Sequence, residues 1–550
     1  MDKAKLTNIK REAKLVQHFS EREVGEDTHI IREKLIHPDG KVTRDIRIVK
    51  DFQRPFWITK EMFRNHKEKK EVELKDRTYE FKSTQSRLAE NIARRLGDQY
   101  VYTGKPNLRL LKESPYLYGI DVDARTIIKH KYLSKYDTVT FNEVAAFDIE
   151  KNILTDEIIV ASLASKKGIF VGILSKLIWK EKEPITKLKQ MYDKYIPDVD
   201  IKNTPLEFKI FSNELELLKW IFKQANNLDI DLLAIWNINY DIPEILDTLR
   251  KYEVDPADIF HYDKIPSKYK YFNFKEGTKT KVTASGRVVP KNPEEIWSTV
   301  KSSSNFYIID AMAAHRYVRA GGATVPGGYS LDNILKEEGV AQKLKFDTGS
   351  VNQGAEWHIY MVKNKPLEYI IYNIWDTMSM LVLDDKTEDL KYVIDLLLGV
   401  SHYDIFNSGP KRIIDAYYFF VLSKGYVLGV KPSNVDTEDK LLGLDEWIVT
   451  LPGYRIIDNG AYALEEGNFI RTNIRTHICD IDAVSSYPSN IRAANVSKDT
   501  THRELLAIEG KNKSEFKIEN INLMFGPINS VQYCRNMFNF PSLKELAEAY

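Results

Sequence analysis

Two acids directly after a short apolar run are the feature that most constrains the fold of this chain. In NEVAAFDIEK (residues 142–151), Val144 to Phe147 form a run typical of a buried strand, and Asp148 and Glu150 follow, two residues apart. Side chains at this spacing share one face of a strand. Burying two like charges is costly without cations, which favours a site for Mg²⁺ or Mn²⁺. An exposed strand end is the alternative, because Asp-x-Glu is common.

A second apolar strand is also followed by an acid. The stretch DLLAIWNINYDIPEIL (residues 231–246) contains the strand, then Asn237, Tyr240 and Asp241, with Pro243 expected to open a helix. Asp241 then falls where strand becomes helix, the end of a strand at which α/β sheets form ligand sites. The alternative is that Asp241 only caps the helix.

A third acid lies on a predicted helix. The stretch KPLEYIIYNIWDTMSMLVL (residues 365–383) begins near Pro366, and Tyr372 and Asp376 stand four residues apart, so one helical face carries a phenol and a carboxylate. A plain amphipathic helix would leave this pair as surface residues. Its apolar stripe consists of Leu367, Ile370, Ile371, Ile374, Trp375, Met378, Leu381 and Val382.

The chain is too long, at 550 residues, for one hydrophobic core. The N-terminal part mixes β-like runs, including a hairpin at a Pro-Asp-Gly turn, with one helical pattern, and a strand-helix alternation follows it. We therefore expect a multidomain protein of α/β and α+β class. The predicted domains are an α+β unit at 1–142, an α/β unit at 143–388, a helix-rich segment at 389–445, and short strands with Gly turns at 446–550.

Composition excludes several classes of protein. No apolar run approaches the length of a membrane helix, and no secretory signal is visible at the N-terminus, so we expect a soluble cytosolic protein. Lys and Arg number 80 against 79 acids, so net charge gives no argument for a polyanionic partner. The two cysteines, Cys479 and Cys534, lack the spacing of a disulfide framework or a zinc site.

The three acidic stretches resemble a known set of motifs. FDIE, NINYD and YNIWD, in that order, are similar to the three exonuclease motifs of family B DNA polymerases. The segment from Tyr329 to Phe346 resembles the one that precedes the third motif in polymerases of T-even-like bacteriophages. GAYALEE (residues 460–466) and DAVSSYPSNIRAANVS (residues 482–497) resemble the palm of those enzymes. Several ordered blocks make coincidence far less probable than for any single motif.

The resemblance implies an RNase H-like 3′→5′ proofreading exonuclease with two cations, Mg²⁺ or Mn²⁺, per active site. Asp148, Glu150 and Asp376 would hold one ion, and Asp148 with water-mediated help from Asp241 the other. Together the ions would promote in-line displacement at the phosphate. Tyr372 would orient the attacking water.

The same resemblance implies further contacts to nucleic acid. Lys343 would neutralise the scissile phosphate, although a surface lysine is the alternative. Asn237, Tyr240, Gly460 and Ala461 would contact DNA, with Asn237 supporting the primer end. Two residues separate Asn237 from Tyr240, where close phage relatives have three. The polar insertion at 272–297 resembles a hairpin that separates primer from template, and a passive surface loop is the alternative.

The stretch DAVSSYPS resembles polymerase motif A, with Ser486 where leucine is usual. By this resemblance Asp482 and the Ala483 carbonyl would bind the polymerase metals. Ser485 and Ser486 would meet the incoming triphosphate, and Tyr487 would pack under its sugar. Taken alone, the stretch would favour a strand-to-helix turn that uses Ser and Pro, whereas together with the other blocks it favours motif A.

Two-metal nucleotidyl transfer needs a second aspartate and basic side chains on the triphosphate. The chain contains neither D-T-D-S nor K-x-x-x-N-S-x-Y-G. At the C-terminus, a capping-box pattern at Ser542 and Glu545 begins an apolar stripe that would pack on the chain's own palm or on a partner. We therefore expect the N-terminal half of a split polymerase, with fingers, motif C and thumb on a second chain. The alternatives are a truncated one-chain polymerase and a catalytically inactive DNA-binding scaffold.

The expected partners follow from this hypothesis. They are primer-template DNA, single-stranded 3′ ends, deoxynucleoside triphosphates, the C-terminal polymerase subunit and a sliding clamp, with no membrane. The expected location is the cytoplasm of an infected bacterial host.

Overall fold

The computed structural model divides the chain into two units, Met1–Ser433 and Asn434–Tyr550. In the second unit it describes only an antiparallel pair of short strands, β19 (Met524–Phe525) and β20 (Ile528–Asn529). The predictions for Gly460, Ala461, residues 482–487 and the C-terminal helix lie outside the described residues. In the first unit the described residues are 9–66, 69–97, 106–282, 287–319, 325–348 and 354–431.

The chain begins with two small antiparallel sheets. The first has the order β1 (Lys10–Phe19), β2 (Thr28–Ile36) and β3 (Val42–Lys50), and its β2–β3 hairpin turns at Pro-Asp-Gly as predicted. Gly40 in that turn has φ +82°, a conformation that glycine adopts without steric cost. The second sheet has β4 (Arg54–Thr59) between β6 (Thr78–Ser83) and β7 (Leu117–Tyr118). The predicted helix in this region is α3 (Leu88–Leu96), and α5 (Ala124–Tyr136) follows.

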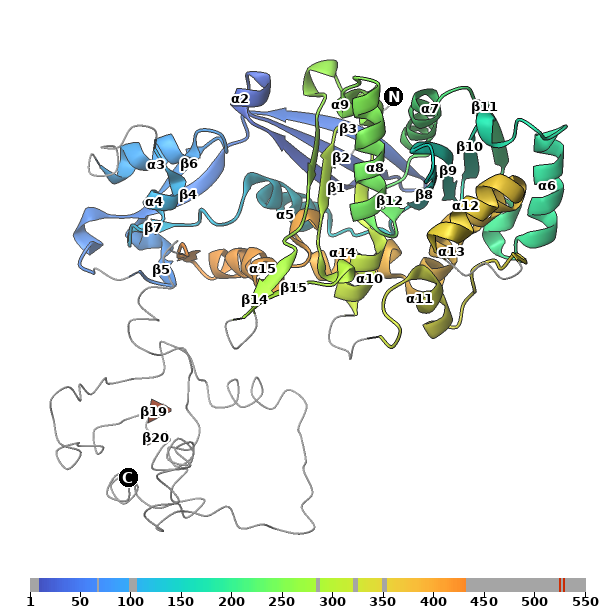
Figure 1. Ribbon diagram of the computed structural model, residues 1–550. Helices are drawn as coiled ribbons and strands as arrows, with labels where there is room; N and C mark the ends of the chain where they lie inside the picture. Colours follow the sequence, from blue (N-terminus) through green and yellow to red (C-terminus); the bar gives the residue numbers. More distant parts are fainter. Residues whose placement is uncertain are drawn as a thin grey trace, which may run out of the picture. The chain divides into compact units, whose positions relative to one another are not determined.

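A mixed sheet of eight strands forms the centre of the first unit (Figure 1). Its central strand β8 pairs antiparallel with β9, which pairs antiparallel with β10, and on its other side β8 runs parallel to β12 and β12 to β17. The fold is therefore mixed α/β, as predicted. In spatial order the strands are β11 (Leu206–Phe211), β10 (Gly168–Leu174), β9 (Glu157–Ser165), β8 (Val144–Asn152), β12 (Leu232–Ile235), β17 (Tyr307–Asp310), β16 (Thr299–Ser302) and β13 (Phe272–Lys275).

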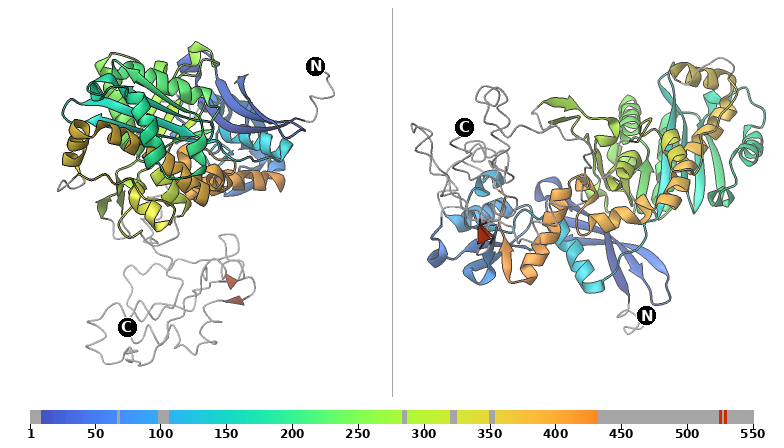
Figure 2. Two further views of the ribbon diagram at one scale, coloured as in Figure 1. Left: turned by 90° about the vertical axis from the view of Figure 1, so that its right-hand side faces the viewer. Right: turned by 90° about the horizontal axis from the view of Figure 1, so that it is seen from below.

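Helices cover both faces of this sheet (Figure 2). Alternate residues of β8 pack on opposite faces, because side chains alternate along a strand. Ala146 packs in the core that contains the long helix α13, whereas Ala145 and Phe147 pack in the core that contains α7 and α8. These helices, with the others on the first face, are α6 (Pro184–Tyr195), α7 (Glu214–Asn227), α8 (Ile238–Lys251), α11 (Leu331–Glu337), α12 (Ala355–Asn364) and α13 (Pro366–Thr387).

Helix α8 corrects one prediction. It begins at Ile238, with Asn237 as its N-cap residue, so Pro243 lies inside the helix and does not open it. Asp241 lies in the first turn and is not the cap residue, so the capping explanation for this acid is wrong. The reason is that Asn237 follows β12 by only two residues, and Ile238 is buried against the sheet, so tertiary packing starts the helix before the proline.

After α13 the chain returns to the N-terminal sheets. A π-helical turn (Asp389–Val393), α14 (Ile394–Leu398) and α15 (Gly409–Ser423) lead to β18 (Tyr426–Leu428). Strand β18 pairs antiparallel with β5 (Val72–Leu74). The expected domain boundaries at 142, 388 and 445 stay predictions.

The polar insertion at 272–297 has strand structure. Its first residues form β13 of the large sheet, and β14 (Thr280–Val282) then pairs antiparallel with β15 (Val288–Pro290). Helices α9 (Pro256–Phe260) and α10 (Ala311–Val318) flank this region in the chain.

Among the described helices, none is both long enough and apolar enough to span a membrane.

Candidate metal centre

Asp148 and Glu150 lie on β8, on the face that α13 covers. Their predicted strand is confirmed, and the two-residue spacing places them on the same side as Ala146. Helix α13 supplies a hydrogen-bond donor to each acid: Asn373 Nδ2 donates to Asp148 Oδ2 at 2.6 Å, and the Tyr369 hydroxyl donates to Glu150 Oε2 at 2.5 Å. Both acids therefore face the helix that carries the third motif.

Asp241 approaches the same place from the end of β12. Strands β8 and β12 run parallel in register, so the first turn of α8 passes beside the residues that follow Phe147 in β8. Asp241 is 4 % exposed, and its Oδ1 atom is buried without a hydrogen-bond partner. A buried carboxylate oxygen left in this state costs free energy unless a cation or a proton satisfies it.

Tyr372 and Asp376 are buried on α13, so the explanation that they are incidental surface residues is wrong. The helix is apolar on its packing face as predicted, but the sheet and the Lys343 segment also cover its polar face. Lys343 Nζ donates to Asp376 Oδ2 at 2.5 Å and to the Tyr372 hydroxyl at 2.9 Å. The alternative that Lys343 is a free surface lysine is therefore also wrong.

The Lys343 segment is held in place by its backbone. The Lys343 amide donates to Asp332 Oδ1 at 3.1 Å, and the indole of Trp375 donates to the Gln342 carbonyl at 2.8 Å. Trp375 and Asp376 are adjacent on α13. The hydrogen bond from Trp375 to Gln342 therefore lies beside the ion pair of Asp376 with Lys343.

Burial and repulsion from neighbouring acids raise the pKa values of the three aspartates. For Asp148, burial and then the charges of Asp241, Glu150 and Asp376 hold the pKa well above its usual value. Burial raises the pKa of Asp241 to about 8, with repulsion from Glu150 adding to it. Burial likewise raises the pKa of Asp376 to about 6, against the opposing effect of Lys343. Four acids that disfavour each other's charge form a site that divalent cations would stabilise.

The pKa values of Tyr372 and Lys343 are both raised, but for different reasons. Burial and the charge of Asp376 raise the pKa of Tyr372, so it remains a phenol that donates hydrogen bonds at neutral pH. Burial alone would lower the pKa of Lys343, but the charge of Asp376 and the hydrogen bonds to Asp376 and Tyr372 outweigh it and raise the pKa above its usual value. Lys343 is therefore a permanent cation within the acidic cluster.

The donor set suits Mg²⁺ or Mn²⁺, because all candidate ligands are carboxylate oxygens. Besides Asp241, Asp376 also has a buried Oδ1 atom without a hydrogen-bond partner. Opposite oxygens around a Mg²⁺ ion are about 4.2 Å apart, from bonds of about 2.1 Å. In the described arrangement, no three of the four acids have ligand oxygens that all lie within 4.8 Å of one another. Shared binding of an ion therefore requires their side chains to rotate toward each other.

Several residues at this site were missed by the analysis of motifs. Asn373 also accepts a hydrogen bond from Ser162 Oγ at 2.5 Å, which links β9 to the carboxylate of Asp148 through the helix. His358 Nδ1 lies 2.6 Å from the Tyr369 hydroxyl oxygen and 3.6 Å from Glu150 Oε2. The available signal was helical spacing, since Tyr369 and Asn373 precede Tyr372 and Asp376 by three residues each.

Two of the residues expected to contact DNA, Asn237 and Tyr240, lie at the start of α8. Asn237 has a buried Oδ1 atom without a hydrogen-bond partner, whereas Tyr240 is 51 % exposed. The exposed ring stands one residue before Asp241, beside the acidic cluster. Contact of these residues with nucleic acid stays a prediction.

Comparison with known proteins adds no assignment to this geometry. Neither a protein-family model nor a curated protein sequence matches the chain.

Proposed function

We propose that this chain is a 3′→5′ exonuclease that hydrolyses phosphodiester bonds at the ends of single-stranded DNA, on an RNase H-like sheet. The observation that carries the proposal is that β8, α8 and α13 bring Asp148, Glu150, Asp241 and Asp376 together beside the hydrogen-bonded pair of Tyr372 and Lys343. The sheet supports it, because β8 and β12 lie where the strand order changes direction, the position at which α/β sheets hold their sites.

The four acids would hold two divalent cations. Asp148, Glu150 and Asp376 would bind one, and Asp148 with Asp241 the other. When bound, the cations would stabilise negative charge on the attacking and leaving oxygens of an in-line displacement. Asn373 and Tyr369 would orient Asp148 and Glu150 for this purpose, as hydrogen-bonded neighbours of metal ligands usually do.

Tyr372 and Lys343 would act on the substrate. The phenol of Tyr372 keeps its proton and accepts a hydrogen bond from Lys343, so its own O–H is directed by that contact and would orient the attacking water. A cation bound to the Asp376 carboxylate would displace Lys343 from it. Lys343 would then contact the scissile phosphate. The ammonium group would then neutralise the phosphate charge that grows during displacement.

The test is degradation of single-stranded DNA labelled at its 3′ end. We expect shortening from the 3′ end that requires Mg²⁺ and disappears in Asp148→Ala and Asp376→Ala. The matched control is Asp385→Ala, an exposed acid on α13 that pairs with Lys166. Degradation that persists in both site variants, or that needs no divalent cation, would contradict the proposal.

The polymerase part of the proposal rests on the resemblance of residues 460–466 and 482–497 to the palm of those polymerases, including motif A. We propose that Asp482 contributes to nucleotidyl transfer only together with a second chain that carries fingers, motif C and thumb. The test is primer extension by this chain before and after mixing with such a chain, with Asp482→Ala as control. Extension by this chain alone, or a mixture that neither associates nor extends primers, would contradict it.

A further inference from the structure

A second group of potential metal ligands lies in the N-terminal sheet. His18 on β1 and His29 on β2 are directly opposite each other in the antiparallel register, so their side chains share one face of the sheet. Asp27 comes just before β2. One ligand atom from each of the three lies within 4.8 Å of the other two. Among the described residues, these three form the one such group of His, Cys, Asp or Glu side chains.

These side chains are buried and incompletely satisfied. His29 is completely buried, and both of its ring nitrogens lack a hydrogen-bond partner, as does Asp27 Oδ1. Unpaired polar atoms at this depth cost free energy and are rare in folded proteins, so Asp27 Oδ1 and one ring nitrogen of His29 are open to a shared ligand.

The distances suit a transition metal. His18 Nε2 lies 3.1 Å from Asp27 Oδ2, and His29 Nδ1 lies 3.7 Å from Asp27 Oδ1. Ligands at about 2.1 Å in a tetrahedron are about 3.4 Å apart, and each histidine lies near this distance from a different oxygen of Asp27. Two imidazoles and one carboxylate favour Zn²⁺ and similar first-row ions over Mg²⁺ or Ca²⁺, which prefer oxygen.

The carboxylate of Asp27 is fixed by a neighbouring segment. The Ser86 amide donates to Asp27 Oδ2 at 2.7 Å, and the Asp51 amide donates to the Asp27 carbonyl at 2.7 Å. The carboxylate is therefore oriented toward the histidines, as a metal ligand with its own hydrogen-bonded support would be.

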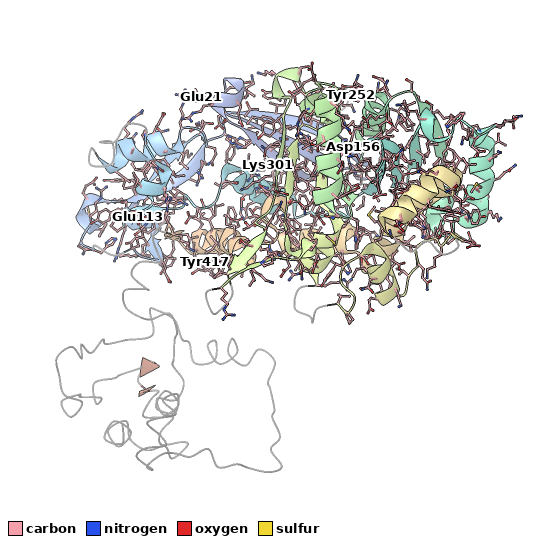
Figure 3. All side chains as sticks on the ribbon, in the orientation of Figure 1. Glu21, Glu113, Asp156, Tyr252, Lys301 and Tyr417 are labelled. Carbon is pink, nitrogen blue, oxygen red and sulfur yellow. The ribbon has the colours of Figure 1, made fainter. Side chains whose placement is uncertain are left out.

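A cavity of about 350 Å³ opens beside the two histidines. It is lined by His18, His29, Gln17 and Gln85, and by the charged residues Arg125 and Lys301, of which Lys301 is labelled in Figure 3. Both cations are paired with Asp404, at 3.1 and 3.2 Å, so neither neutralises Asp27. Three protein ligands beside a polar cavity leave room for water or another small ligand in the fourth position.

We propose that His18, Asp27 and His29 bind one Zn²⁺ ion per chain, with the fourth position open to this cavity. The site joins β1, the start of β2 and, through Asp27, the segment that contains Ser86. Its ligands are distinct from the four acids beside α13, and its chemistry selects a different class of cation.

The test is Zn²⁺ titration of the full chain after removal of metals with a chelator, in buffer with excess Mg²⁺ to saturate oxygen-ligand sites. We expect one equivalent of Zn²⁺ by calorimetry, a visible spectrum of four-coordinate Co²⁺ on substitution, and a higher melting temperature with Zn²⁺. His18→Gln and His29→Gln should each lower the affinity for Zn²⁺ by about tenfold or more.

Two controls separate this site from other ligands. His37→Gln, at the far end of the same hairpin and hydrogen-bonded to Thr43, should bind Zn²⁺ as the unmodified chain does. The double variant Cys479→Ser, Cys534→Ser should also retain binding. If His29→Gln does not fold, His18→Gln decides, because its side chain is 20 % exposed. Absence of stoichiometric binding, or equal binding by the His18 variant, would overturn the proposal and leave a hydrogen-bonded His-Asp pair.

Discussion

The ammonium group of Lys343 lies 2.5 Å from Asp376 Oδ2, within the cluster of acids proposed to bind cations. A lysine in this position competes with a cation for the same carboxylate, and its release would free it for a phosphate group. The contact therefore connects the loop before α12 to the state of the metal centre.

Replacing Lys343 separates these two roles. In Lys343→Met we expect weaker exonuclease activity, by about 10- to 100-fold, because the phosphate loses a charged donor. We also expect half-maximal activity at a lower Mg²⁺ concentration, because Asp376 no longer has a competing cation. The measurement is the rate of 3′-end degradation against Mg²⁺ concentration. Lys345→Met, an exposed lysine two residues on, is the control and should change neither quantity.

The two tyrosines of α13 should differ in their effects. Tyr369→Phe removes the donor to Glu150, so we expect a higher Mg²⁺ requirement, with much of the lost rate recovered at saturating Mg²⁺. Tyr372→Phe removes the group proposed to orient water, so we expect a lower maximal rate, by about 10- to 100-fold, at an unchanged Mg²⁺ requirement. Identical Mg²⁺ titrations for the two variants would contradict this division.

Asn373 should act as a positioning residue. Its amide joins Ser162 on β9 to Asp148 on β8, so Asn373→Leu leaves a buried hydroxyl and a carboxylate oxygen without their partner. We expect unfolding free energy to fall by about 1–3 kcal/mol and the Mg²⁺ requirement to rise. Denaturant unfolding and Mg²⁺ titration measure the two effects. Asn364→Leu, on the exposed end of α12, should leave both close to their original values.

Stability without divalent cations should decrease as the pH rises. Folded Asp241 keeps its proton up to about pH 8, whereas an unfolded aspartate loses it near about pH 4. Between these values the folded state binds more protons, so the unfolding free energy falls with increasing pH. We expect Asp241→Asn to flatten this dependence and to be the more stable protein at pH 8.5, by about 1 kcal/mol or more.

Denaturant unfolding at a series of pH values, in the presence of a chelator, measures this dependence. Asp247→Asn, on the exposed side of the same helix, is the matched control and should follow the unmodified chain. Added Mg²⁺ should restore stability at high pH in the unmodified chain more than in Asp241→Asn.

A buried ion pair connects the N-terminal hairpin to the large sheet. Asp231, just before β12, lies 2.6 Å from Lys34 Nζ and 3.1 Å from an Arg44 guanidinium nitrogen. In Asp231→Ala two mostly buried cations lose their partner, and we expect the unfolding free energy to fall by about 3–5 kcal/mol. Asp247→Ala removes an exposed pair with Arg250 and should cost about 0–1 kcal/mol. Equal losses in the two variants would contradict this account.

Local pattern in the sequence determined the elements that carry the site. The apolar run before Asp148 predicts β8, the apolar stripe after Pro366 predicts α13, and the Pro-Asp-Gly turn predicts the β2–β3 hairpin. Each of these depends on alternation or helical spacing within one segment, which the order of residues alone contains. The four acids and Tyr372 were identified by the same short motifs.

Only the tertiary structure decided what those side chains contact. Lys343 reaches Asp376 across 33 residues, Asn373 reaches Asp148 across 225, and the start of α8 depends on how Ile238 packs against the sheet. The opposition of His18 and His29 likewise depends on strand register. These contacts follow from packing between segments that are distant in the sequence. The spacing of residues within one segment contains no information about them.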